Sequence, residues 1–124
     1  MTNRKSIIIG TVLTGVAALV LAFDAAMKLA NIAPVREAMA QVGYPTDLAR
    51  ILGAVLLACV ALYVNTRTAP LGAVLLTGWL GGAVATHVRI SDPLFSHVLA
   101  PVYMGALIWG GLYLRDDRVR ALVR

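Results

Sequence analysis

The chain has a single cysteine, Cys59, and few charged side chains. One thiol cannot form an internal redox pair and the C-x-x-C pattern is missing, which argues against thiol–disulfide chemistry within the chain. Cys59 is therefore expected to be a small apolar packing residue. Charged residues make up 14% of the 124 residues, whereas soluble domains contain about 25%. This scarcity of charge argues against a water-soluble domain.

Motifs for several kinds of enzyme chemistry are missing as well. The sequence contains no Gly-rich phosphate loop, no dinucleotide-binding fingerprint and no nucleophile–base pair. The net charge of +5 does not indicate nucleic-acid binding, because the basic residues lie at the ends of apolar segments, where they set the orientation of a membrane protein. No nucleic-acid partner is expected.

Four apolar segments without Asp, Glu, Lys or Arg fill most of the chain. They are 17, 16, 21 and 22 residues long: Ile7–Phe23, Ile51–Thr66, Thr68–Val88 and Pro93–Leu114. A helix rises about 1.5 Å per residue, so these segments are long enough, or nearly so, to cross a hydrocarbon core of about 30 Å. They are too continuously apolar for barrel strands, which leaves an all-α fold. We predict one domain over residues 1–124, an integral membrane four-helix bundle with helices at about 6–29, 47–65, 68–88 and 93–115.

Lysine and arginine are unevenly divided between the two ends of this bundle. Of the 11 such residues, 7 fall on the side that holds both termini and 4 on the side of the first and third loops. The positive-inside rule predicts that both termini are cytoplasmic and that the first and third loops face outward.

The first loop has the pattern of a short helix. Pro34 suits a first helical turn and Gly43 suits a helix end. Between them, apolar residues follow the spacing i, i+3, i+4, i+7: Val35, Ala38, Met39 and Val42. This pattern predicts a short interfacial helix between the first two membrane helices.

Small residues recur every four positions on three of the membrane helices. The three sets are Gly10, Thr14, Ala18, Ala22 and Ala26; Gly78, Gly82 and Thr86; and Ala106 and Gly110. Such faces allow two helix backbones to approach closely. Two interpretations are open, close packing within the bundle and a homodimer formed through these faces.

The most polar stretch of the chain joins the third and fourth helices. It holds both histidines, an arginine and an aspartate: His87, Arg89, Asp92 and His97. Two crossings separate it from the first loop, so Asp24 and Lys28 lie at the same end of the bundle and can approach it. Asp24 and Lys28 are four residues apart, which places them on one helix face where they can pair. These six residues form the candidate ligand-binding site.

Two prolines bear on this site. Asp92-Pro93 fits a helix N-cap followed by proline at the first helical position. Pro101 is expected inside the fourth helix, where it would free the carbonyl of His97 and kink the helix. A freed carbonyl beside a histidine suits a polar ligand group or an ordered water.

Three interpretations of the polar cluster are open. In the first, the side chains anchor and cap the outer ends of two helices. In the second, they bind a lipid-soluble ligand such as a quinone, with a histidine donating to a quinone carbonyl while Arg89 and Asp92 orient the head group. In the third, His87, His97 and Asp92 bind a metal. Their spacing matches no compact ligand motif and the histidines lie on different helices, so no metal is assigned.

Several segments resemble one known family. They are Tyr63-Val-Asn-Thr-Arg67-Thr-Ala, Leu76-Thr-Gly-Trp-Leu-Gly-Gly-Ala83, Ala85-Thr-His-Val-Arg89, Asp92-Pro-Leu-Phe-Ser-His97, Trp109-Gly-Gly-Leu-Tyr-Leu-Arg-Asp116 and the Lys28-Leu29 step. They resemble the DoxX-like family of small bacterial membrane proteins over nearly the whole chain. The resemblance implies a four-helix bundle in the bacterial cytoplasmic (inner) membrane. Relatives include the membrane subunit of a thiosulfate:quinone oxidoreductase, partners of redox-stress enzymes and, more distantly, eukaryotic membrane chaperones.

One position departs from that family. Many members carry a glutamate three residues after the glycine that matches Gly53, and this chain has Leu56 there. A carboxylate inside the membrane is costly and therefore points to function. Without it, a proton-relay role of the second helix is in doubt, and any chemistry rests on the outer cluster.

The function expected from these observations is a quinone- or lipid-binding membrane component that supports a redox system. The alternative is a noncatalytic membrane assembly or chaperone factor. The partners expected are the lipid bilayer and a soluble or membrane redox enzyme. The residues leave open whether the protein is an enzyme and which ligand it takes.

Overall fold

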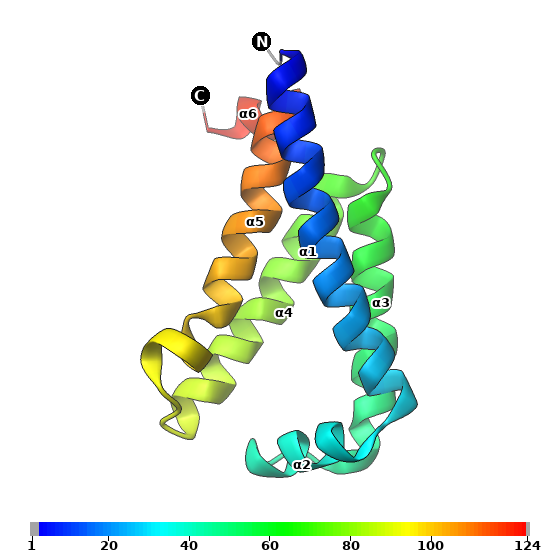
Figure 1. Ribbon diagram of the computed structural model, residues 1–124, viewed down its shortest axis with the longest axis vertical. Coiled ribbons are helices and arrows are strands. Elements are labelled where there is room, and N and C mark those ends of the chain that lie inside the picture. The colour runs from blue at the N-terminus through cyan, green and yellow to red at the C-terminus, as the bar shows by residue number, and fades with distance from the viewer. Residues whose placement is uncertain (1–2, 124) are drawn as a thin grey trace.

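The computed structural model describes residues 3–123 and is built from helices, with no strand within those residues (Figure 1). In chain order the elements are α1 (Arg4–Ala30), α2 (Ala33–Gln41), the 3-10 turn η1 (Thr46–Leu48), α3 (Ala49–Val64), α4 (Ala69–Arg89), the π-helical turn η2 (Leu94–Val98), α5 (Ala100–Arg115) and α6 (Asp117–Leu122).

Four helical segments of the described chain are long and apolar enough to cross a membrane: Arg4–Ala30, Thr46–Val64, Ala69–Arg89 and Leu94–Arg115. Large apolar side chains remain exposed on these helices, and Leu19 is 74% and Phe23 66% exposed. Exposure of this kind is costly in water and favourable in lipid. The predicted all-α membrane bundle, with its short helix α2 between the first two spans, is confirmed.

Each of the five prolines opens a helical element. Pro34, Pro70 and Pro101 lie in the first turns of α2, α4 and α5, and Pro45 and Pro93 immediately precede η1 and η2. Proline suits these positions because the first helical N–H groups have no partner within the helix.

The fourth span is divided, which corrects the expectation for Pro101. Because η2 ends at Val98 and α5 begins at Ala100, Pro101 starts a helix and does not interrupt one. The Leu99 N–H donates to the Leu94 carbonyl in a π-type turn, 2.9 Å away. The segment that carries His97 is therefore separate from α5.

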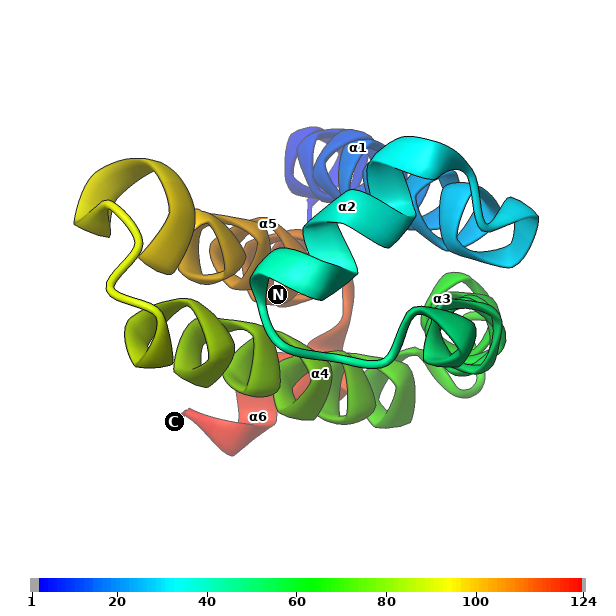
Figure 2. The same ribbon diagram turned by 90° about the horizontal axis from the view of Figure 1, so that it is seen from below.

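The four long helices form a ring in which α1 and α4 each pack against both α3 and α5. Both termini lie at one end of the bundle, and α2 and η2 lie at the other (Figure 1). Viewed from that second end, α2 runs across the space enclosed by the long helices (Figure 2). The bundle therefore has a terminal end and an α2 end.

Close approach between helices depends on glycines. A Cβ at Gly10 would lie 2.6 Å from the Gly111 carbonyl oxygen, which fixes the α1–α5 contact near the termini. A Cβ at Gly53 would lie 2.9 Å from the Ala25 carbonyl oxygen, where α3 crosses α1. Of the small residues expected to pack, Gly10 and Thr14 on α1 are buried, whereas Ala26 and Ala106 are exposed, and the close contact on α5 is made by Gly111.

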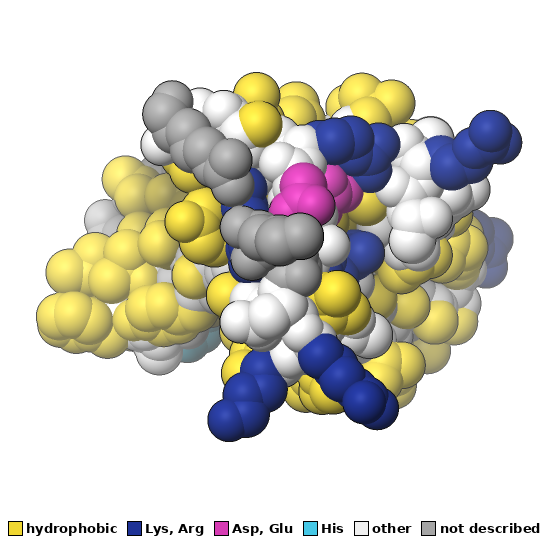
Figure 3. All heavy atoms as spheres, turned by 90° about the horizontal axis from the view of Figure 1, so that it is seen from above, with side chains coloured by type: hydrophobic (Ala, Val, Ile, Leu, Met, Phe, Trp, Pro, Cys, Tyr) yellow, Lys and Arg dark blue, Asp and Glu magenta, His cyan; other side chains and the backbone are white. Residues whose placement is uncertain are grey.

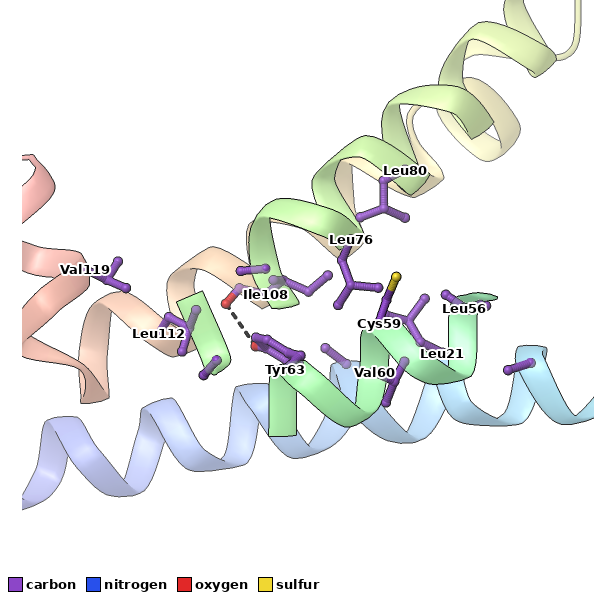
Figure 4. Close-up of a cluster of buried hydrophobic side chains, with 14 residues drawn as sticks. Leu21, Leu56, Cys59, Val60, Tyr63, Leu76, Leu80, Ile108, Leu112 and Val119 are labelled. Carbon is purple, nitrogen blue, oxygen red and sulfur yellow. Dashed lines mark hydrogen bonds between the residues drawn. The ribbon is translucent and has the colours of Figure 1, made fainter. Parts of the chain in front are cut away.

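A continuous apolar core fills the centre of the ring (Figure 4). Leu56 and Cys59 are both buried in it, so both are packing groups of α3. Tyr63 is fully buried, and its hydroxyl lies 2.9 Å from the Ile108 carbonyl oxygen and 3.3 Å from the Thr14 hydroxyl. The Arg115 Nε donates to that Thr14 hydroxyl at 3.0 Å. The hydroxyls of Tyr63 and Thr14 therefore both have hydrogen-bond partners inside an otherwise apolar core.

Basic side chains gather on the terminal end of the molecule (Figure 3). Among them, Arg118 donates to the carbonyl oxygens of Thr66 and Arg67 and forms a 2.8 Å ion pair with Asp116. Hydrogen bonding from Arg118 lowers the pKa of the Asp116 carboxyl. This contact ties the start of α6 to the α3–α4 connection.

Candidate ligand-binding cavity

A cavity of about 730 Å³ lies at the α2 end, between α1, α2, α3 and α4. Its volume falls within the range of about 300–1,000 Å³ that is common for small-molecule sites. No residue of α5 lines it. The lining is mostly apolar and includes Met27, Pro34, Val35, Ala38, Met39, Val42, Leu48, Leu52, Gly78, Trp79, Gly82 and Ala83.

The polar lining residues come from three parts of the chain. They are Asp24 and Lys28 on α1, Tyr44 after α2, and Thr86 and His87 near the end of α4. The sequence predicted that the end of α1 lies near the polar stretch that joins the third and fourth membrane helices, and the structure places Asp24, Lys28 and His87 on one cavity.

The short helix α2 covers this cavity with its apolar face. All four residues of the predicted apolar stripe line it: Val35, Ala38, Met39 and Val42. Met39 is only 5% exposed, whereas Arg36 and Glu37 are exposed on other faces of the helix. The apolar stripe that predicted an interfacial helix therefore faces the cavity, and α2 covers the cavity at this end.

Asp24 and Lys28 form the predicted pair. The Lys28 Nζ donates to Asp24 Oδ1 at 2.6 Å, and the two side chains are 19% and 37% exposed, in that order. Pairing lowers the cost of keeping two charges beside an apolar cavity. The Lys28 ammonium has further N–H donors beyond the one used on Asp24, so it can also bind an acceptor group of a ligand.

His87 is held by Asp92. The His87 Nδ1 lies 2.5 Å from Asp92 Oδ2. The His97 ring contacts the His87 ring edge-on, with centroids 5.9 Å apart, and its own Nδ1 lies 2.8 Å from the Ser96 hydroxyl. Of these residues only His87 lines the cavity.

The expected N-cap role of Asp92 is wrong. Pro93 occupies the cap position of η2, and no side chain caps that turn. Instead, the Asp92 N–H donates to the His87 carbonyl at 3.1 Å and the Ser91 N–H donates to the Val88 carbonyl at 3.1 Å. With Ser91 at φ 58°, this is a Schellman-type ending of α4. It turns the chain back so that the Asp92 carboxylate reaches the ring of His87.

The second membrane span also begins without a side-chain cap. Thr46 and Asp47 lie within η1, and neither the start of η1 nor that of α3 has a side-chain cap.

Arg89 has a different position from the other predicted site residues. Its guanidinium donates to the Val42 carbonyl at the end of α2, and it does not line the cavity. Nearby, the Tyr44 hydroxyl lies 2.9 Å from the Thr86 hydroxyl. Gly43, between Val42 and Tyr44, has φ 82°, a left-handed backbone conformation that suits glycine. Arg89 and Tyr44 therefore fasten the end of α2 to α4.

Trp79, Gly78 and Gly82 are lining residues that the sequence did not assign to the site. The two glycines were expected to form a helix-packing face. A Cβ added at either glycine would meet no atom within 4 Å. These glycines line the cavity and do not pack closely against another helix of the same chain. Their spacing alone cannot separate the two roles.

Over residues 3–123, no group of three or more His, Cys, Asp or Glu side chains is arranged to hold a metal ion. His87, Asp92 and His97 form a cluster through the His87–Asp92 bond and the contact between the two histidine rings. The arrangement as a whole can bind an apolar molecule that carries a small polar head.

Fold and cavity together define a small multi-pass membrane protein whose bundle encloses a cavity at one end. The model of the DoxX-like family matches residues 12–111, and the chain belongs to that family. Neither a curated protein nor a solved structure matches the chain.

Proposed function

We propose that the cavity at the α2 end binds a quinone, and that the protein is the quinone-binding membrane component of a redox system. The proposal rests on one observation, the distribution of apolar and polar side chains around the cavity. Apolar side chains make up most of the wall, while Asp24, Lys28, Tyr44, Thr86 and His87 supply the polar groups. A quinone has the matching division, a polar head ring joined to an apolar tail.

The position of the cavity in the membrane also supports a lipid-soluble ligand such as a quinone. The cavity lies among helices that expose large apolar side chains, so a ligand that partitions into lipid can reach it without crossing water. We also propose that the protein lies in the cytoplasmic membrane with both termini in the cytoplasm, because Lys and Arg are concentrated at the terminal end. The cavity then opens near the outer surface.

The experiment places a larger side chain in the cavity and follows quinone binding by the fluorescence of Trp79. In a Trp109→Phe background, Trp79 is the sole tryptophan and lines the cavity, so a bound quinone will quench its fluorescence. The probe is a decyl-substituted benzoquinone added to protein in lipid nanodiscs. A Gly82→Leu change puts a side chain into the cavity and should weaken saturable quenching at least about tenfold, or about 1.4 kcal/mol.

The matched control is Gly81→Leu. Gly81 is the neighbouring residue on α4, also has no atom within 4 Å of an added Cβ, and does not line this cavity. It should leave the affinity unchanged. Equal loss in both variants, or no saturable quenching in the parent protein, would contradict quinone binding. Purified protein that carries a stoichiometric protein partner and no quinone would favour the noncatalytic assembly role instead.

A further inference from the structure

The two ring nitrogens of His87 have different surroundings. Nδ1 lies 2.5 Å from Asp92 Oδ2, and the two side chains are 28% and 25% exposed, in that order. A carboxylate accepts hydrogen bonds and donates none. In the neutral ring, Asp92 therefore holds the proton on Nδ1, as carboxylates do for histidines that act as proton acceptors.

The other nitrogen, Nε2, then carries a lone pair. Within residues 3–123 the only hydrogen bond of the His87 ring is the one at Nδ1. The His97 ring touches the His87 ring edge-on and is itself bonded to Ser96 at Nδ1. Nε2 is therefore the ring atom left for a ligand.

The bond to Asp92 also sets the direction of this acceptor. His87 lines the cavity and Asp92 does not, and Nε2 points away from the side of the imidazole that faces the carboxylate. The backbone turn at Ser91 and Asp92, with its two hydrogen bonds to α4, holds the carboxylate in place.

We propose that the cavity selects the hydroquinone over the quinone, with His87 Nε2 accepting a hydrogen bond from a ligand hydroxyl and Asp92 as the positioning residue. This inference rests on the proposed binding of a quinone-class ligand and adds its preferred redox form. Quinone carbonyls only accept hydrogen bonds and cannot pair with a lone pair, whereas a hydroquinone hydroxyl can donate to it. The quinone-binding interpretation of the sequence has the opposite polarity, with a histidine that donates to a quinone carbonyl.

The size of the preference follows from one hydrogen bond. A net hydrogen bond corresponds to roughly three- to tenfold in affinity. We expect wild type to bind the hydroquinone tighter than the quinone by that factor, after correction for the partition of each form into protein-free nanodiscs. The probes are the decyl-substituted benzoquinone and its hydroquinone, measured anaerobically at pH 8.

Asp92→Asn tests the positioning role. An amide does not fix the ring proton on Nδ1 as a carboxylate does, so the affinity ratio should fall toward one. His87→Ala removes the acceptor and should also lower the ratio. Asp47→Asn removes a carboxylate from the same end of the bundle without touching the cavity lining and should keep the wild-type ratio. Melting temperatures of all variants show whether each remains folded.

A second measurement reads the proton directly. In a His97→Gln background, the ¹⁵N chemical shifts of His87 should show a protonated Nδ1 and an unprotonated Nε2 at pH 8. A proton on Nε2 would overturn the inference. An affinity ratio that is the same in wild type and in Asp92→Asn would also overturn it, while leaving quinone binding intact. Failure of wild type to bind either form would remove the proposed function and this inference together.

Discussion

Gly72 and Gly81 lie on the same helix, and the same substitution should have opposite effects at the two positions. A Cβ at Gly72 would lie 2.3 Å from the Tyr63 backbone nitrogen and 2.5 Å from its Cα. These are backbone atoms of α3 beside the short α3–α4 connection, so they cannot move aside as a flexible side chain would. A Cβ at Gly81 would meet no atom within 4 Å.

The magnitudes follow from two opposing effects. Replacing glycine by alanine inside a helix gains up to about 1 kcal/mol, because glycine loses more backbone entropy on folding. Overpacking costs about 1–3 kcal/mol, and a backbone obstacle puts Gly72 at the upper end of that range. We therefore expect Gly72→Ala to lower the free energy of unfolding by about 1–2 kcal/mol. Gly81→Ala should raise it by up to about 1 kcal/mol.

The assay is unfolding of the detergent-solubilised protein by heat and by increasing denaturing detergent, followed by circular dichroism. Each variant is measured by both methods. If heat and denaturing detergent give the same direction of change, the change is in stability and not in the way the protein unfolds. The reasoning would be refuted if Gly72→Ala were as stable as wild type, or if both variants shifted in the same direction. Either result would mean that α3 and α4 do not approach as closely as the contact at Tyr63 requires.

Two further predictions concern the Asp24–Lys28 pair and the orientation of the protein in the membrane. Because Lys28 pairs with Asp24 at 2.6 Å, a double-mutant cycle with alanine should show a coupling of about 0.5–1 kcal/mol in thermal stability; strictly additive losses would show no coupling. If the termini are cytoplasmic, then in a Cys59→Ala background Ser91→Cys should react with an impermeant maleimide in intact cells. Leu122→Cys, which is at the terminal end, should not, and the reverse pattern would invert the orientation.

Long apolar segments and local spacing made much of the fold predictable. The lack of charge in each segment indicated the spans, because a charge in lipid is costly and its absence over many residues is easily detected. The Asp24–Lys28 pair was predictable for a related reason, since residues four apart on a helix are neighbours whatever the tertiary structure.

The polar site was less predictable because it depends on turns and on contacts between distant segments. Asp92 before a proline has the local signature of an N-cap, yet a turn with Ser91 in the left-handed region brings it to His87. No glycine marks that turn. Likewise, nothing in the neighbourhood of Arg89 or Tyr44 indicates that they meet α2 and α4 across the end of the bundle.

The placement of the prolines determines where this protein can bend. None of the first three spans has a proline in its interior, so each behaves as a stiff rod. The fourth is jointed at Leu99, between the π-helical turn and α5. Beside the termini α1 is held against α5, where Gly10 lies against Gly111. The cavity lies at the opposite end, so we expect changes in its volume to come from movement of its cover, α2, and from tilting of the stiff spans at that end.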